Sequence, residues 1–335
     1  MLGGSLIGIT EPFKCGKLPS VPTGPLPNSC VLRANGCMCS SGCQSTFACR
    51  PSALCSQLAA GPRSRDVPIL MFLHFNRTHV RHKHSRRPMQ AYEREVNRLV
   101  WLLRSAQRVG TSLPLHVVVA GDRNASAEDR LRQHGATITE STTVDAPRWS
   151  SSFHKFSFSR IAALAMTQFR KVIVIDNDMT LIGNIDDLAD AEAPAMVWHT
   201  ATVLPKKERC APTGGLFVLE PSATEFAKAL QHLTVLNRKT ASAGSFSGGV
   251  RCYDGSDQEF WRSFYRPMYE LPLRYHAHNG LVMNSSEWNQ IRLMHNIAGF
   301  KVHQRRLPKS LRKQVRYFTG DGTDQARLQF NVTGE

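Results

Sequence analysis

Short apolar runs alternate with amphipathic stretches up to the sequence KVIVIDNDMT at residues 171–180, and this alternation constrains the fold most. The pattern predicts strands over residues 66–75, 113–122, 136–138 and 172–175, with helices over 92–103, 126–135 and 158–169. A β-α-β-α-β-α-β order predicts an α/β protein with a three-layer, mostly parallel sheet. In such sheets ligands bind at the carboxyl ends of the strands. Asp176 and Asp178 follow the last of these strands, so they are expected at a ligand site.

Beyond residue 180 the alternation is less regular. We expect strands over residues 194–199 and 214–221, a helix over 222–233, a flexible insertion over 238–249 and a helix over 257–265. Ser222 is placed to cap the first of these helices, with Glu225 as its capping-box partner. The predicted organisation is a leader over residues 1–65, an α/β domain over 66–303 and a basic tail over 304–335.

The leader is rich in Cys, Pro, Gly and Ser and is read as low-complexity sequence without a packed core. Seven of the nine cysteines lie between Cys15 and Cys55, and their spacing matches no common zinc-binding pair pattern. Disulfides in an oxidising compartment are favoured over a zinc module. Sequons for N-glycosylation begin at Asn76, Asn124, Asn284 and Asn331. They favour a Golgi or other secretory-pathway location, with the cytoplasm as the alternative.

The net charge of +16 favours an anionic partner, since Lys and Arg number 42 against 26 Asp and Glu. Charge alone does not choose among nucleotides, acidic glycans, nucleic acids and membrane surfaces. The sequence has no apolar run of about 18 residues, so no transmembrane segment is expected in it.

Asp176 and Asp178 allow two interpretations. They are placed to hold a divalent cation that carries a diphosphate. Alternatively, Asp176 is a nucleophile and Asp178 an acid/base, because DNDMT also fits the D-x-D-x-T pattern of haloacid-dehalogenase-type phosphatases. The sequence near Asp321 and Asp324 resembles the magnesium motif of those phosphatases, but no strongly apolar strand precedes it. In that superfamily the nucleophile also ends the first strand, whereas here much α/β sequence precedes Asp176.

Four segments between residues 66 and 303 resemble, in order, those of family 8 glycosyltransferases, the glycogenin-like group. They are SRIAALAMTQFRKVIVIDNDMT, TGGLFVLEPS, DGSDQEFW and HNIAGFK. The resemblance implies the nucleotide-diphospho-sugar transferase (GT-A) fold and a hexosyltransferase that retains anomeric configuration. The chain departs from the family at Thr213 and Gly214, which stand where the family has Asn and Ser, and it lacks the usual nucleotide-contacting strand end.

The resemblance also implies the site residues. Metal binding falls to Asp176, Asp178 and His295, with Mn²⁺ as the expected ion and Mg²⁺ as the alternative. The catalytic candidates, which would face the sugar, are Asp254, Asp257 and Gln258. Donor contacts fall to Asp176, Asn177, Arg160, Thr213, Gly214, Gly215, Gly299 and Lys301. A carboxylate-held cation makes chemical sense here, because negative charge develops on the departing diphosphate.

The sequence thus predicts a metal-dependent glycosyltransferase that moves a hexose from a nucleotide-diphosphate sugar, expected to be a UDP-sugar. None of the six tyrosines lies in a segment that matches the self-glucosylated loop of glycogenin-like proteins. We therefore expect an external acceptor, an anionic glycan, a glycolipid or a protein, and no nucleic-acid partner. The rival hypotheses are the phosphatase and a basic binding protein on the same fold that has lost catalysis.

Overall fold

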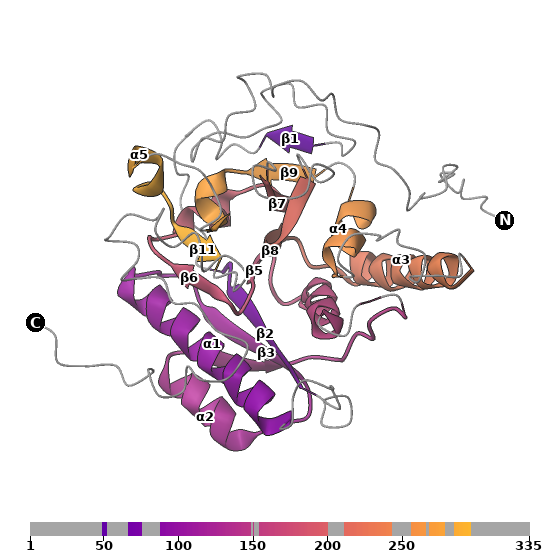
Figure 1. Cartoon of the computed structure of the whole chain (residues 1–335), viewed down its shortest axis with the longest axis horizontal. Coiled ribbons are helices and arrows are strands. Elements are labelled where there is room, and N and C mark those ends of the chain that lie inside the picture. Colours follow the sequence, from indigo (N-terminus) through magenta and orange to yellow (C-terminus); the bar gives the residue numbers. More distant parts are fainter. Residues whose placement is uncertain are drawn as a thin grey trace, which may run out of the picture.

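The computed structural model describes residues 49–51, 66–75, 88–148, 150, 154–199, 211–242, 256–265, 268–278 and 285–295. Within these residues the main sheet has the strand order β1-β9-β7-β8-β5-β2-β3-β4 (Figure 1). Its strands are β1 (Cys49–Pro51), β2 (Ile69–Phe75), β3 (Leu115–Gly121), β4 (Thr137–Glu140), β5 (Val172–Ile175), β7 (Ala195–His199), β8 (Ala211–Leu219) and β9 (Met268–Leu271). Strand β8 runs antiparallel to β5 and β7, and the other neighbouring pairs are parallel.

Helices cover both faces of the sheet, as parallel strands require. One face packs against α1 (Pro88–Arg108) and α2 (Ala125–Gln133), and the other against the 3₁₀ helix η4 (Lys155–Ala165), α3 (Ala223–Ser242) and α4 (Gln258–Phe264) (Figure 1). Successive side chains of a strand point to opposite faces. In β2, Ile69 and Met71 accordingly belong to the core under α1, whereas Leu70 and Phe72 belong to the core under η4 and α3. The three-layer, mostly parallel sheet predicted from the sequence is confirmed.

The predicted helix over residues 158–169 is the main local difference. The structure has a 3₁₀ helix over Lys155–Ala165 instead of an α-helix. The hydroxyls of Ser157 and Ser159 each donate to the carbonyl three residues earlier, at 2.7 and 2.6 Å. Such local bonds from Ser compete with the α-helical ladder, and this favours the tighter 3₁₀ turn.

The α3 helix extends further than expected. Ser222 Oγ accepts from Glu225 N at 3.0 Å, which confirms the predicted cap, whereas the Glu225 carboxylate pairs with Lys228 instead of closing a capping box. The helix continues to Ser242, so residues 238–242 of the predicted insertion are helical. Residues 243–249 lie outside the described part of the chain.

A second, smaller sheet was not predicted. It has the order β10-β11-β6, formed by β6 (Met179–Leu181), β10 (Ala277–His278) and β11 (Leu293–His295). The short elements around it are η5 (Asp186–Asp190), η7 (Leu273–Tyr275) and α5 (Ser285–Trp288). In this sheet His295 pairs with Met179, the residue after Asp178. The small sheet therefore brings a residue from the end of the described chain to the aspartate pair.

Most of the predicted leader, and all of the predicted basic tail, lie outside the described residues. Within the leader, β1 pairs in parallel with β9, so three leader residues extend the edge of the main sheet. In the described ranges, every helix is too short or too polar to cross a bilayer.

Candidate active site

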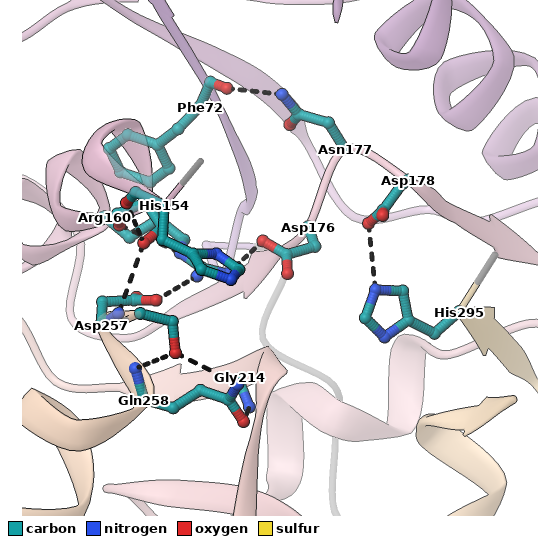
Figure 2. Close-up of polar contacts among 12 residues, drawn as sticks. Phe72, His154, Arg160, Asp176, Asn177, Asp178, Gly214, Asp257, Gln258 and His295 are labelled. Carbon is teal, nitrogen blue, oxygen red and sulfur yellow. Dashed lines mark hydrogen bonds and ion pairs between the residues drawn. The ribbon is translucent and has the colours of Figure 1, made fainter. Parts of the chain in front are cut away.

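Asp176, Asn177 and Asp178 form a turn where β5 leaves the main sheet for β6. The backbone N–H of Asp176 donates to Gly215 O of β8 at 2.9 Å. The side-chain amide of Asn177 donates to Phe72 O of β2 at 2.8 Å (Figure 2). Ties to both neighbouring strands hold the turn at the carboxyl end of the sheet, where the sequence predicted a ligand site.

Arg160 of η4 joins two of the predicted carboxylates. Its guanidinium donates to Oδ1 of Asp176 and to Oδ1 of Asp257, as Figure 2 shows. Arg160 is only 6% exposed, and Asp257 is fully buried. Because a planar guanidinium directs its N–H groups in fixed directions, this one side chain sets the relative placement of the two carboxylates.

Both carboxylate oxygens of Asp257 are occupied. Oδ1 accepts from Arg160, and Oδ2 accepts from the Trp261 indole N–H at 2.8 Å. The backbone N–H of Asp257 also donates to Ser157 Oγ of η4, at 3.4 Å. These contacts anchor the start of α4 to η4, so Asp257 is built into the wall of the site.

Asp178 lies on the other side of the turn, opposite His295 of β11. Their Oδ1 and Nε2 atoms are 3.1 Å apart, and Figure 2 shows the two side chains facing each other. Asp176, Asp178 and His295 each offer one ligand atom within 4.8 Å of the others. The sequence predicted these three residues as a set, and the structure brings them together.

The pKa values of the two aspartates shift in opposite directions. Desolvation raises the pKa of Asp176, with help from the charges of Asp178 and Asp257 and against that of Arg160. Desolvation acts the same way on Asp178, but the His295 imidazole and Arg98 outweigh it and hold the pKa of Asp178 below its ordinary value. The same pairing raises the pKa of His295 against its own desolvation. Crowded carboxylates of this kind favour a bound cation.

The donor set of this triad fits a divalent metal. Two carboxylate oxygens and one imidazole nitrogen suit Mn²⁺, whereas Mg²⁺ prefers oxygen ligands alone. Among the described residues, His295 Nδ1 is buried without a hydrogen-bond partner, so no such partner there fixes the ring.

Gly214 and Gly215 of β8 are glycines because other side chains occupy the space of a Cβ. A Cβ on Gly214 would lie 2.4 Å from Gln258 Cγ, and one on Gly215 would lie 2.2 Å from His276 Nε2. Gly214 N donates to Gln258 Oε1 at 2.8 Å, which ties β8 to the start of α4. Thr213 precedes them in β8 and is half-buried.

Sequence reasoning missed two residues beside the site. Arg98 of α1 precedes Trp101 and Ser105 on one helix face, and those two bond Thr180 Oγ1 and Leu181 N of β6 at 2.8 and 3.0 Å. This face of α1 lies along β6, which begins directly after Asp178. Desolvation lowers the pKa of Arg98, but its pairing with Glu95 and the charges of Asp178 and Asp176 outweigh it and raise that pKa. The spacing of residues 98, 101 and 105 was visible in the sequence, but nothing in it linked that face to Asp178.

The second missed residue is His276, which is 1% exposed and packs against the ring of His295. Three predicted site residues, Asp254, Gly299 and Lys301, lie outside the described ranges. Asp321 and Asp324 of the phosphatase hypothesis lie outside them as well.

No protein-family model matches the chain. Two curated relatives from Arabidopsis thaliana are similar to part of it. Galactinol synthase 7 is 23% identical over 173 residues, covering 42% of this chain and 52% of that protein. The putative glucuronosyltransferase PGSIP8 is 26% identical over 188 residues, covering 55% of this chain and 34% of that protein. The chain thus spans about half and about a third of the length of these relatives.

Among solved structures, the glycosyltransferase GlyE of Streptococcus pneumoniae TIGR4 matches with a TM-score of 0.47 and 15% identity, over 74% of this chain and 58% of that one. The WbbM bifunctional glycosyltransferase matches with a TM-score of 0.46 and 12% identity, over 68% and 45%. With TM-scores below 0.5, these likenesses carry no functional inference. In sequence, at low identity, the chain is similar to glycosyltransferases.

Proposed function

We propose that this chain is a metal-dependent, retaining glycosyltransferase of the GT-A type that moves a hexose from a UDP-sugar to an external acceptor. The observation that carries the proposal is that two sets of carboxylate contacts lie next to each other at the end of β5. Arg160 joins Asp176 to Asp257, and next to them Asp178 faces His295. The names of the two sequence relatives support the same class of reaction.

The reaction breaks the bond between the anomeric carbon and the diphosphate oxygen, and that oxygen keeps the electron pair. A bond from the acceptor oxygen to the anomeric carbon forms on the same face of the sugar, and the acceptor proton passes to the leaving diphosphate. Asp176, Asp178 and His295 would hold the cation, which when bound neutralises charge on the leaving group. Arg98 and Arg160 add fixed positive charge close to the same carboxylates.

The proposed role of the other residues at the site is to position the reacting groups and to exclude water. Asp257 has both oxygens engaged, so its proposed part is to hold Arg160 and α4 rather than to attack the sugar. Gln258 lies at the start of α4 with its amide against Gly214, on the side where the resemblance places the sugar. Asp254, Gly299 and Lys301 stay in the proposed sugar and phosphate contacts by resemblance alone. A secretory-pathway location remains part of the proposal and rests on the sequons and the cysteine-rich leader.

The test removes the metal ligand that faces His295. Asp178→Asn should lower Mn²⁺-dependent hydrolysis of UDP-glucose at least about 100-fold, because the variant loses a charged ligand. Asp129→Asn is the matched control, since it makes the same change on the exposed side of α2. Thermal melting with UDP and Mn²⁺ should show stabilisation of the wild type and of the control only.

The outcomes separate the hypotheses. Full activity in Asp178→Asn would show that the metal assignment is wrong. Release of phosphate from a phosphomonoester in an Asp176-dependent way would favour the phosphatase. A wild type that neither melts higher with UDP and Mn²⁺ nor hydrolyses the donor would favour the binding protein that has lost catalysis.

A further inference from the structure

His276 and His295 lie next to each other although the proposed site uses only one of them. Their ring centroids are 4.9 Å apart at an interplanar angle of 63°, so the edge of one ring meets the face of the other. His276 directly precedes β10, and β10 pairs with β11, the strand that carries His295. His276 therefore lies at the start of a strand adjacent to the one that carries His295.

His276 also packs closely against the backbone of β8 at Gly215. Its Nε2 lies where a Cβ on Gly215 would stand, at 2.2 Å from the ideal position. Gly215 O in turn accepts the N–H of Asp176. A buried ring thus fills the space between the strand that positions Asp176 and the ring of His295.

A metal-binding histidine usually has its second ring nitrogen held by a hydrogen bond, which fixes the direction of the first. His295 Nδ1 has no such partner within the described part of the chain. Apart from the contact of Nε2 with Asp178, packing is what limits rotation of the ring, and within the described ranges the ring of His276 packs against it.

We propose that His276 is a positioning residue: wedged against Gly215, it holds the His295 ring so that Nε2 faces Asp178 and the cation. This inference rests on the proposed function, since it requires a metal at Asp176, Asp178 and His295. It also explains why residue 215 is a glycine, because a methyl group at that position would displace His276. His276 itself is not assigned as a ligand. Among the described residues, the ligand atoms that lie close enough together to share one ion belong to Asp176, Asp178 and His295.

The test measures binding of Mn²⁺ alone to the full chain, by the loss of the free-ion electron paramagnetic resonance signal, without donor or turnover. His276→Ala should weaken Mn²⁺ binding about 10–100-fold, the usual effect of losing a residue that orients a metal ligand. His276→Phe keeps a packed ring without nitrogens and should stay within a few-fold of the wild type. Circular dichroism and thermal melting establish that each variant is folded.

A double-mutant cycle tests the wedge directly. Gly215→Ala alone should weaken Mn²⁺ binding, but in the His276→Ala background it should add little, since the displaced ring is already gone. Gly214→Ala is the matched control. It collides with Gln258 instead, at 2.4 Å, so its effect should add to that of His276→Ala.

Each outcome bears on the claim. If His276→Ala binds Mn²⁺ like the wild type, or if Gly215→Ala and His276→Ala act additively, the positioning role is overturned while Asp178-dependent binding leaves the proposed function standing. If His276→Phe, although folded, loses as much as His276→Ala, the nitrogens matter and packing is not the cause. If His276→Ala fails to fold, Gly215→Ala and His276→Phe decide. If the wild type binds no Mn²⁺, both this inference and the proposed metal site fail.

Discussion

At the scale of single residues, Arg160 is the centre of a buried ionic group. Its guanidinium is almost fully buried and pairs with two carboxylates, one of them without exposure to solvent. Desolvation opposes its charge, yet Asp176 and Asp257 raise the pKa of Arg160 above its ordinary value. Removing one member of a buried ionic group leaves the other charges unpaired in the interior, which is more costly than losing an exposed pair.

We therefore expect Arg160→Met to lower the free energy of unfolding by about 3–5 kcal/mol. Arg160→Lys should recover part of this loss, because an ammonium group carries the charge but cannot make the same planar, two-sided contact. Lys228→Met is the control, since its pair with Glu225 is exposed and should be worth only about 0–1 kcal/mol. Urea denaturation measures all three, and equal losses for Arg160→Met and Lys228→Met would contradict the argument.

At the scale of elements, Asp186 ties η5 to the loop that joins α1 to β3. It begins η5, and its carboxylate accepts from the loop between α1 and β3: from the Thr111 hydroxyl, and from the Ser112 N–H and hydroxyl at 2.9 and 2.8 Å. Asn184 donates a further hydrogen bond at 3.3 Å. Desolvation would raise the pKa of this buried carboxyl, but the hydrogen bonds from Thr111, Ser112 and Asn184 outweigh it and lower the pKa.

The sign of the pH dependence follows from that lowered pKa. The pKa of an Asp in the unfolded chain is about 3.9. Ionised Asp186 therefore stabilises the folded chain above this pH, and this stabilisation is lost as the pH falls toward the lower pKa of Asp186 in the folded chain. Asp186→Asn should cost about 1–3 kcal/mol at pH 7. Its deficit relative to the wild type should shrink below about pH 4. Chemical denaturation at pH 7 and in the acid range measures this, and a deficit that does not change with pH would rule out the carboxylate as its source.

At the scale of the whole molecule, the placement of tyrosines bears on the acceptor. Tyr92 and Tyr275 are buried in the core, where Tyr92 is on the inward face of α1 and Tyr275 donates to Asp187 at 2.5 Å. Desolvation, with the charges of Glu128 and Glu93, raises the pKa of Tyr92 to about 12. Hydroxyls that are buried this way are poor acceptors for a transferred sugar, so we do not expect these two tyrosines to be glycosylated. The proposed acceptor is external, and the net charge of +16 would attract an anionic one.

Intact-mass measurement of the full chain after incubation with UDP-glucose and Mn²⁺ tests this directly. We expect no added hexose on the protein, while hydrolysis or transfer to an added acceptor consumes the donor. A ladder of whole hexose units on the wild type, absent from Asp178→Asn, would mean that the chain glycosylates itself.

The sequence alone determined the layered fold as far as β5, because runs such as Val172–Ile175 and the helical spacing of Tyr92, Val96 and Leu99 are local signals of burial. It also predicted the triad, through four segments that resemble one family. Even there, local hydroxyl bonds at Ser157 and Ser159 turned an expected α-helix into a 3₁₀ helix.

Only the tertiary structure decided the contacts that make the site. Strands β6, β10 and β11 have two or three residues each, too few to show a period, so the sheet that joins Asp178 to His295 was not predictable. The wedge of His276 against Gly215, the approach of Arg98 along β6 and the enclosure of Asp257 by Arg160 and Trp261 are all packing relations. Most of them join residues far apart in the chain. The periodicity of a sequence indicates which residues of one element are buried, but not which side chains of distant elements come into contact in the folded protein.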